Sequence, residues 1–323
     1  MSRYLIRADG GPHIGFGHIT RSSALADALS AAGHHLTWLS ATPDILPQRV
    51  RARDDIHAID PADRPDLIIE AARDKQAAAL IGDWVHSDAE LVSNLRARGL
   101  PVALVGNVTG DTQCDLFVRQ RLIAQEDGYG PHYLDGPAYL LLPDAYHDLP
   151  ARAPQGRARR VLISLGGSRS ALIDRIFKLA EALCEHAGLE LDRLRPEPGA
   201  QPHPPREIVD RLTRADFAIL AGGTSLHEAA ACRLPTLCLP IVPRQLERAS
   251  HWETLGFGIS LVPDTPHWEG EFEREFHRFI EDDAFRANAA TAMATLVDGR
   301  GTQRVAAALT ARWAAPATIT ESV

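Results

Sequence analysis

The feature of this sequence that most constrains its fold is an alternation of short apolar runs with longer helical patterns. In the first half the runs predict strands at 4–9, 35–41, 79–83, 101–105 and 115–118, with helices over 19–32 and near 88–98. In the second half they predict strands at 161–165, 216–221 and 235–241, with helices over 171–186, from 224 and near 245. This alternation is typical of parallel sheets covered by helices on both faces. We therefore predict an α/β protein with two tandem halves and a cleft between them.

One segment, 147–160, interrupts the alternation. It contains prolines, a glycine and several arginines, and it has no apolar period, as expected for a linker. We predict an N-terminal domain over 1–148, a linker over 149–160 and a C-terminal domain over 161–323. The tail after Ala314 is expected to fray.

Composition excludes several classes of protein. The net charge of −8 over 323 residues argues against a general nucleic-acid binder, because binding to the phosphate backbone requires a basic surface. The four cysteines show no C-x-x-C spacing, which is typical of a reduced, cytoplasmic protein. No apolar run reaches the roughly 18 residues that span a bilayer, so no integral membrane segment is expected.

The loop after the first predicted strand carries the first candidate site. Gly15 and Gly17 allow the backbone to come close to a ligand, and His18 begins the next helix. The positive end of a helix dipole disfavours imidazolium, which suits a histidine that takes a proton from water or a hydroxyl. Arg21 falls on the same helix face, and Asp9 could orient either side chain. A solvent-facing or capping histidine is the alternative.

The second candidate site follows two strands of the second half. Gly222 and Gly223 expose backbone amides, and a helix starting at Thr224 aims its dipole at the same point, as in a diphosphate site. Glu228, one turn into the helix, could accept hydrogen bonds from a ribose diol. The alternative for Glu228 is a capping box with Ser225. The turn Gly166-Gly167-Ser168 would line the same cleft, or form an ordinary βα turn.

No metal site is expected, because the histidines lack partners at ligand spacing and no Asp-x-Asp occurs. A bound diphosphate would be neutralised by helix ends and basic side chains, and no cofactor is predicted.

Taken together, these residues resemble a known family. The series Asp9, 14–18 (IGFGH) and Arg21 is similar to the opening of the nucleotide-sugar hydrolases of pseudaminic acid synthesis (PseG) and the spore-coat polysaccharide proteins (SpsG). The stretch 136–147 (GPAYLLLPDAYH) is similar to the family's G-x-x-Y-x-L-L-R-x-x-F, and 296–309 resembles its closing segment. The second-half pattern, 222–228 with Pro235 and Gln245, is shared more widely with GT-B glycosyltransferases of the MurG type.

This resemblance implies a GT-B architecture of two Rossmann-like domains facing across a cleft. It also implies a UDP-sugar hydrolase in which His18 activates water at the anomeric carbon of a modified, amino-deoxy sugar and UDP is released. The implied substrate-binding residues are Asp9, Gly15, Gly17, Arg21 and Asp83. The implied nucleotide-binding residues are Gly166, Gly167, Ser168, Gly222, Gly223, Thr224, Ser225, Glu228 and Gln245.

Three departures from the family concern the sugar side. Val85 stands where the family has a tyrosine, 106–108 (GNV) replaces an acidic pair, and Arg244 replaces an asparagine before Gln245. These departures indicate a different sugar or acceptor on the same leaving-group machinery. The alternatives to a hydrolase are a glycosyltransferase that uses an organic hydroxyl or amine in place of water, and a non-catalytic nucleotide-sugar binding or scaffold protein.

Overall fold

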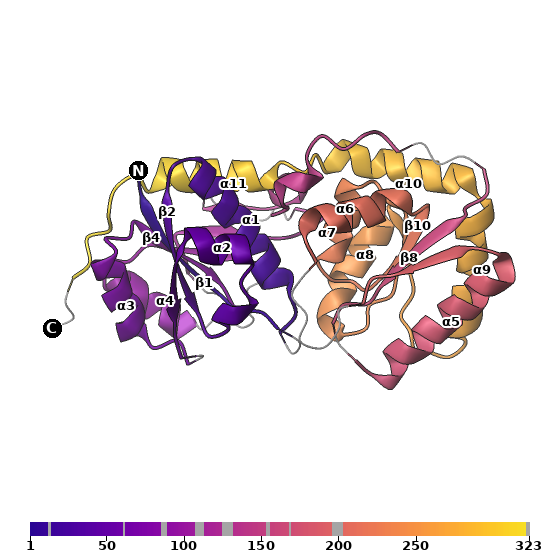
Figure 1. Ribbon diagram of the computed structural model, residues 1–323, viewed down its shortest axis with the longest axis horizontal. Coiled ribbons are helices and arrows are strands. Elements are labelled where there is room, and N and C mark those ends of the chain that lie inside the picture. The colour runs from indigo at the N-terminus through magenta and orange to yellow at the C-terminus, as the bar shows by residue number, and fades with distance from the viewer. Residues whose placement is uncertain are drawn as a thin grey trace. The chain divides into compact units, whose positions relative to one another are not determined.

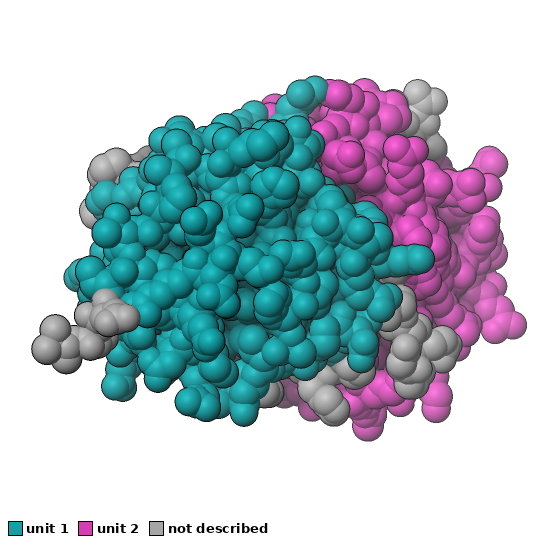
Figure 2. Space-filling model, turned by 60° about the vertical axis from the view of Figure 1, so that its left-hand side comes forward, with its two compact units in different colours: residues 1–143, 300–323 teal, residues 144–299 magenta. Residues whose placement is uncertain are grey.

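A computed structural model describes residues 1–11, 14–60, 62–84, 89–106, 113–124, 132–152, 156–167, 169–195 and 203–320. The chain forms two compact units, which Figure 2 distinguishes by colour. Unit 1 comprises residues 1–143 and 300–323, and unit 2 comprises residues 144–299. Each unit is built around its own parallel sheet (Figure 1).

The unit 1 sheet has the strand order β3-β2-β1-β4-β5-β6-β7, and every pairing is parallel. The strands are β1 (Arg3–Ala8), β2 (His35–Ser40), β3 (Asp55–Ala58), β4 (Ala79–Asp83), β5 (Val102–Val105), β6 (Leu116–Val118) and β7 (Tyr133–Leu134). In the register of β1 against β4, Ala8 is paired with Asp83. Asp83 therefore ends its strand beside the start of the β1–α1 loop.

Helices cover both faces of this sheet. They are α1 (Gly17–Ala31), α2 (Gln48–Arg53), α3 (Pro65–Asp74), α4 (Ala89–Ala97) and α11 (Gly301–Arg312), with short 3-10 turns η1 (Pro43–Ile45) and η2 (Pro137–Tyr139). Alternate residues of β1 point to opposite faces: Tyr4 and Ile6 pack with residues of α1 and α11, and Leu5 packs with residues of α3 and α4. Figure 1 shows α11 running beside α1.

The unit 2 sheet has the order β12-β11-β10-β8-β9, again all parallel. Its strands are β8 (Arg160–Ser164), β9 (Glu190–Arg193), β10 (Phe217–Leu220), β11 (Thr236–Cys238) and β12 (Gly258–Ser260). Its helices are α5 (Ala171–Ala187), α6 (Pro205–Arg214), α7 (Ser225–Ala231), α8 (Leu246–Thr254), α9 (Trp268–Glu281) and α10 (Asp283–Leu296), with η3 (Asp144–Tyr146) and η4 (Pro243–Gln245). A core cluster joins β8 and β10 to α5 and α9 through residues such as Ile163, Phe217, Ile176 and Phe276.

The predicted α/β class is confirmed, and the strands predicted from apolar runs form the middle of both sheets. The division of the chain differs from the predicted domains. Residues 300–323, assigned by sequence to the second domain, belong to unit 1, and the predicted linker 149–160 lies within unit 2. Arg152, inside that segment, donates to the carbonyls of Leu212 and Cys232 in unit 2.

The tail does not fray as expected. Ala317 N donates to Ala77 O at 2.9 Å and Thr320 N donates to Arg98 O at 3.0 Å, so the tail is tied to unit 1 as far as residue 320. In the part of the chain that is described, none of the helices combines the length and apolar character needed to cross a membrane.

Candidate functional site

The β1–α1 loop of unit 1 is held in place by backbone contacts. Gly11 and Gly15 exchange two hydrogen bonds, of 3.2 and 2.7 Å, and Gly10 N donates to Thr42 Oγ1 at 3.0 Å. Gly15 has a φ of +92°, a conformation that glycine adopts without the strain other residues incur. This loop delivers His18 into the first turn of α1.

Three residues singled out in the sequence meet at the end of β4. His18 Nδ1 lies 2.7 Å from Asp83 Oδ1, Arg21 Nε donates to Asp83 Oδ2 at 2.7 Å, and a second nitrogen of Arg21 also contacts Asp83. Ser22 Oγ adds a bond of 2.9 Å to Asp83 Oδ2. The Asp83 side chain is fully buried, whereas His18 keeps 19% of its side chain exposed.

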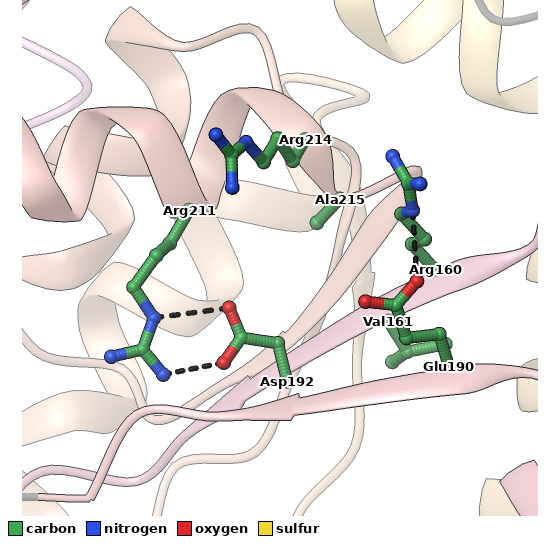
Figure 3. Close-up of a pocket in the computed structure, with 7 residues that line it drawn as sticks. All are labelled: Arg160, Val161, Glu190, Asp192, Arg211, Arg214 and Ala215. Atoms are coloured by element: carbon green, nitrogen blue, oxygen red, sulfur yellow. Dashed lines mark hydrogen bonds and ion pairs between the residues drawn. The ribbon is translucent and has the colours of Figure 1, made fainter.

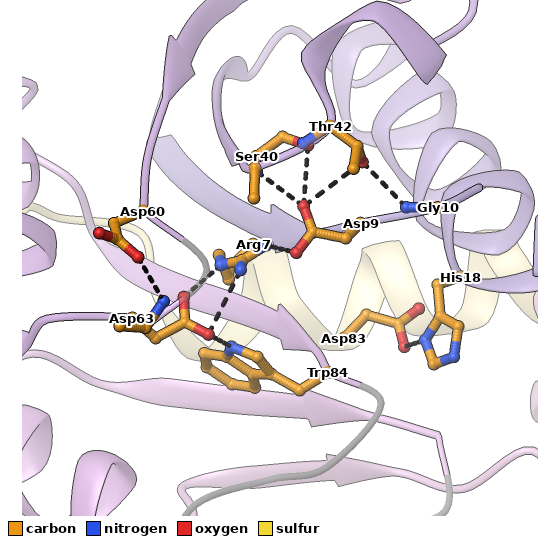
Figure 4. A network of polar contacts seen from close by, with 12 residues as sticks. Arg7, Asp9, Gly10, His18, Ser40, Thr42, Asp60, Asp63, Asp83 and Trp84 are labelled. Carbon is orange, nitrogen blue, oxygen red and sulfur yellow. Dashed lines mark hydrogen bonds and ion pairs between the residues drawn. The ribbon is translucent and has the colours of Figure 1, made fainter. Parts of the chain in front are cut away.

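Two contacts bear on the tautomer of His18. An ionised carboxylate accepts hydrogen bonds only, so the 2.7 Å contact with Asp83 favours a proton on Nδ1, and Arg21 Nη2, 3.0 Å from the same nitrogen, then approaches it as a second donor. This leaves Nε2, which points away from Asp83 in Figure 4, as the nitrogen that can accept a proton. The arrangement is that of a general base oriented by a buried carboxylate.

Arg21 keeps Asp83 ionised. Burial alone would raise the pKa of Asp83, but the charges and hydrogen bonds of Arg21 and His18 outweigh it and hold that pKa below its ordinary value. Gly106, with a φ of +107°, makes room for this pair, because a Cβ there would lie 2.8 Å from Arg21 Nη2.

Asp9 does not orient His18 or Arg21, contrary to the sequence-based expectation. Its carboxylate turns toward β2, where it accepts hydrogen bonds from Ala41 N at 2.7 Å and Ser40 Oγ at 3.1 Å (Figure 4). The strand order places β2 and β4 on opposite sides of β1. Asp9 therefore contacts residues at the end of β2, whereas His18 contacts Asp83 at the end of β4. Asp83 therefore takes the orienting position.

A second polar network next to this cluster was not predicted. Arg7, 2% exposed, pairs with Asp9 at 2.6 Å and with Asp63, which also accepts from Trp84 Nε1 at 2.9 Å (Figure 4). Burial raises the pKa of Asp63 despite its pairing with Arg7. The sequence does carry a signal for this network, since an arginine inside the central apolar strand must be buried and must have a charged partner.

In unit 2, the glycine turn after β10 packs against η4. A Cβ on Gly222 would lie 2.7 Å from the Cβ of Gln245 and 2.9 Å from its carbonyl oxygen, so only glycine fits. The Gln245 side chain is fixed by accepting from Ile241 N at 2.8 Å. Arg248 Nη1 donates to Gly222 O at 2.8 Å, which brings a positive charge to the turn.

The capping-box explanation for Glu228 does not hold. Thr224, not Ser225, is the N-cap residue of α7, and no side chain caps this helix end. Glu228 instead faces Tyr146 of η3. Burial raises the pKa of Glu228 to about 7, and the interaction with Tyr146 partly opposes that rise.

Gly166 and Gly167 follow β8, which pairs directly with β10 in the sheet. Gly166 has a φ of +78°, and a Cβ there would meet no atom within 4 Å. Their turn and the Gly222–Gly223 turn thus lie at the carboxyl edge of adjacent strands. Ser168 lies outside the described residues, as do Val85 and the Asn107-Val108 departure.

Comparison with known proteins places these features in a family context. No family model matches the chain. The spore coat polysaccharide biosynthesis protein SpsG of Bacillus subtilis (strain 168) is 24% identical over 361 aligned residues, covering 94% of this chain and 96% of that protein.

Solved structures agree with this fold over nearly the whole chain. MurG of Acinetobacter baumannii has a TM-score of 0.65 at 14% identity, covering 96% of this chain and 99% of its own. The calicheamicin glycosyltransferase CalG4 has a TM-score of 0.66 at 15% identity, covering 96% and 98%. The rhamnosyltransferase SpnG complexed with thymidine diphosphate has a TM-score of 0.60 at 17% identity, covering 94% and 99%. The chain is thus similar to SpsG over nearly its whole length and has the GT-B fold of these solved structures.

In this GT-B chain, a pocket of about 220 Å³ lies at the amino edge of the unit 2 sheet, away from the glycine turns (Figure 3). Arg160 pairs with Glu190 at 3.0 Å and Arg211 pairs with Asp192, so most of the charged side chains that line it neutralise one another. It is therefore not a candidate for the nucleotide site, because open α/β sheets bind ligands at the carboxyl ends of their strands.

Proposed function

We propose that this chain is an enzyme that acts on nucleotide sugars. In the proposed reaction an oxygen nucleophile attacks the anomeric carbon, the bond from that carbon to the diphosphate oxygen breaks, and the nucleoside diphosphate leaves with the bonding electrons. The observation that carries the proposal is the cluster of His18, Asp83 and Arg21, because it holds a partly exposed imidazole against a buried carboxylate.

Unit 1 supplies the base in this proposal. His18 Nε2 takes the proton of the attacking hydroxyl, and Asp83 stabilises the imidazolium that results by holding its Nδ1–H. Arg21 neutralises Asp83 before and after the transfer, so the charge of the cluster changes only by the proton that His18 gains. We assign Gly15 and Gly17 to the shaping of this loop, and Arg21 and Asp83 to the positioning of the base.

Unit 2 supplies the leaving-group site. We assign the diphosphate to the amides of 222–225 and to the positive end of α7, with Arg248 as an additional positive charge. Glu228 would accept hydrogen bonds from the ribose. Gly166, Gly167, Ser168 and Gln245 complete the proposed nucleotide-binding set.

The attacking hydroxyl distinguishes two candidate functions. Water as the nucleophile gives a UDP-sugar hydrolase acting on a modified amino-deoxy sugar, as the resemblance to PseG implies. An organic hydroxyl gives a glycosyltransferase, which is favoured by the solved structures MurG, CalG4 and SpnG, two of which are named as glycosyltransferases. The thymidine diphosphate bound to SpnG supports the inclusion of dTDP-sugars among the substrates to be tested.

The experiment is to incubate the protein with a panel of UDP-, dTDP- and CMP-sugars and to detect nucleotide and sugar products by mass spectrometry. Free sugar without an added acceptor identifies a hydrolase, whereas nucleotide release that requires an acceptor identifies a transferase. We expect His18→Ala to lower kcat by about 10²–10⁴-fold, the range of general base catalysis, with the nucleotide Kd changed less than about twofold.

The matched control for this variant is His35→Ala, which removes an exposed histidine at the start of β2 and should keep full activity. Full turnover by His18→Ala would disprove the assignment of the base. Absence of nucleotide release from every sugar in the panel would disprove the proposed function as a whole.

A further inference from the structure

The peptide that joins Gly222 to Gly223 in unit 2 lies between two residues without a Cβ. Such a peptide can reverse its plane at little steric cost. The change between type I and type II turns is an example, in which the reversed form needs a positive φ at the residue that follows the peptide. The φ of Gly223 is not positive, so the structure holds one of these two orientations. A contact is needed to keep the peptide in it.

Arg248, in the first turn of α8, makes such a contact. Its Nη1 donates to Gly222 O at 2.8 Å, and a hydrogen bond from a charged donor is stronger than one between neutral groups. In a planar trans peptide the carbonyl and the amide N–H point in opposite directions. By holding Gly222 O, the guanidinium therefore also fixes the direction of Gly223 N–H.

Close packing fixes only one side of this peptide. A Cβ on Gly222 would lie 2.7 Å from Gln245 Cβ, so Gly222 is pressed against η4. The nearest neighbour of a Cβ on Gly223 would be Gln245 Nε2, at 3.8 Å, which leaves that residue room to turn. The hydrogen bond from Arg248 therefore selects the orientation that packing leaves open.

The amide groups of this turn have no backbone partner in the part of the chain that the structure describes. None of the N–H groups of 222–225 donates to the backbone carbonyl of a described residue, and Gly223, Thr224 and Ser225 are half-buried. Backbone N–H groups are strong donors that require an acceptor. The carbonyl of Gly222 is thus occupied, whereas the neighbouring N–H groups remain available to an acceptor on a ligand.

We propose that Arg248 is a positioning residue for the diphosphate, because its hold on Gly222 O keeps Gly223 N–H directed at the leaving group. This inference rests on the proposed function, which assigns the diphosphate to the amides of 222–225. A reversed peptide would present Gly222 O to the ligand in place of an N–H, and a carbonyl oxygen repels a phosphate oxygen. Arg248 therefore acts through the backbone in addition to supplying positive charge.

The test is a double-mutant cycle measured by isothermal titration of UDP into wild type, Arg248→Met, Gly223→Ala and the double variant. We expect Arg248→Met to bind UDP about tenfold more weakly than wild type. Alanine at 223 disfavours the positive φ that the reversed peptide needs, so it should replace part of what Arg248 provides. The double variant should accordingly bind about threefold more tightly than the product of the two single effects predicts. Any direct contact of the added methyl group with UDP cancels in the cycle.

Arg214→Met is the matched control, since it removes the same charge from an exposed arginine at the end of α6, at the amino edge of the sheet. Its UDP affinity should stay within about twofold of wild type. Thermal unfolding checks that each variant folds. If Arg248→Met does not fold, Arg248→Lys replaces it in the cycle, because lysine keeps the charge and the aliphatic stem but lacks the guanidinium fork, and the same sign of coupling is expected.

The outcomes separate the two proposals. If wild-type protein binds UDP and the effects of the two substitutions simply multiply, the positioning role is refuted and the proposed function stands. A loss in Arg214→Met as large as that in Arg248→Met would likewise refute it, because the loss would then follow net charge. If wild-type protein binds no nucleoside diphosphate, the nucleotide site itself is refuted, and the role of Arg248 falls with it.

Discussion

The two candidate sites differ in how much of their structure is explained without a ligand. In unit 1, His18, Arg21 and Ser22 converge on one fully buried carboxylate. In unit 2, the glycine turn packs closely against Gln245, and Glu228 faces the buried phenol of Tyr146. The first site is a preformed charged cluster, and the second is a backbone shape that presents amide groups.

This difference predicts that removing the buried charge of unit 1 has a large effect on both turnover and stability. Asp83→Asn should lower kcat about 10²–10³-fold and lower the free energy of unfolding by about 2–4 kcal/mol, because it leaves Arg21 buried without a counter-charge. Steady-state kinetics and urea unfolding measure the two effects. Asp27→Asn removes a carboxylate whose partners Arg49 and Arg53 lie at the surface, and it should cost less than about 1 kcal/mol. Equal losses of unfolding free energy in Asp83→Asn and Asp27→Asn would show that the buried carboxylate is no more important to stability than the exposed one.

In unit 2, stability and UDP binding should instead be sensitive to added side-chain volume at the glycine turn. Gly222→Ala places a methyl group 2.7 Å from Gln245 Cβ, so we expect a loss of about 1–3 kcal/mol in the free energy of unfolding and weaker binding of UDP. Gly223→Ala is the matched variant, because its nearest neighbour, Gln245 Nε2, lies 3.8 Å away and leaves room for a methyl group. Thermal unfolding and UDP titration of the pair test this, and similar behaviour of both variants would show that packing against Gln245 does not restrict the turn.

Glu228 gives unit 2 its own dependence on pH. A folded-state pKa of about 7, above the ordinary 4.5, means that the native state holds a proton that the unfolded chain releases. Stability from this group is complete below pH 4.5 and is lost as pH rises through 7. We expect Glu228→Gln to gain about 2 kcal/mol relative to wild type between pH 5 and pH 8. Urea unfolding at both pH values measures it, and a difference independent of pH would contradict the raised pKa.

The smallest effect is expected from chelation. Because the proposal assigns the diphosphate charge to backbone amides, the α7 dipole and Arg248, EDTA should leave nucleotide release unchanged. Turnover assayed with EDTA and then with added Mg²⁺ checks this expectation. Strong inhibition that Mg²⁺ reverses would assign the charge to a divalent ion instead.

The parts of the fold that the sequence predicts are the ones that local physics determines. The runs that become β1, β4, β8 and β10 are apolar because central strands of a parallel sheet are buried on both faces. The strands β3 and β9 lie at sheet edges, where exposure allows the polar sequences DIHA and ELDR, so no apolar run marks them.

Side-chain contacts depend on strand order, which periodicity does not contain. Asp9 directly follows β1 and Asp83 ends β4, and the sequence contains no local reason for one to meet His18 rather than the other. The order β2-β1-β4 decides it, since Asp9 turns to β2 and His18 contacts the last residue of β4. The sequence marks Gly222 as a source of backbone amides for a ligand, but the packing of Gln245 against it depends on tertiary structure and leaves no local pattern.

The return of α11 to the first sheet has a consequence for how the molecule is made. Val305 and Leu309 fill the same core as Tyr4 and Ile6, so the layer around the base-bearing loop is complete only after residue 309 has been synthesised. Unit 2, continuous from 144 to 299, leaves the ribosome earlier with all of its strands present. Nascent chains should accordingly fold unit 2, to which we assign nucleotide binding, before unit 1, to which we assign the base, and shortening the C-terminus should impair unit 1 while sparing unit 2.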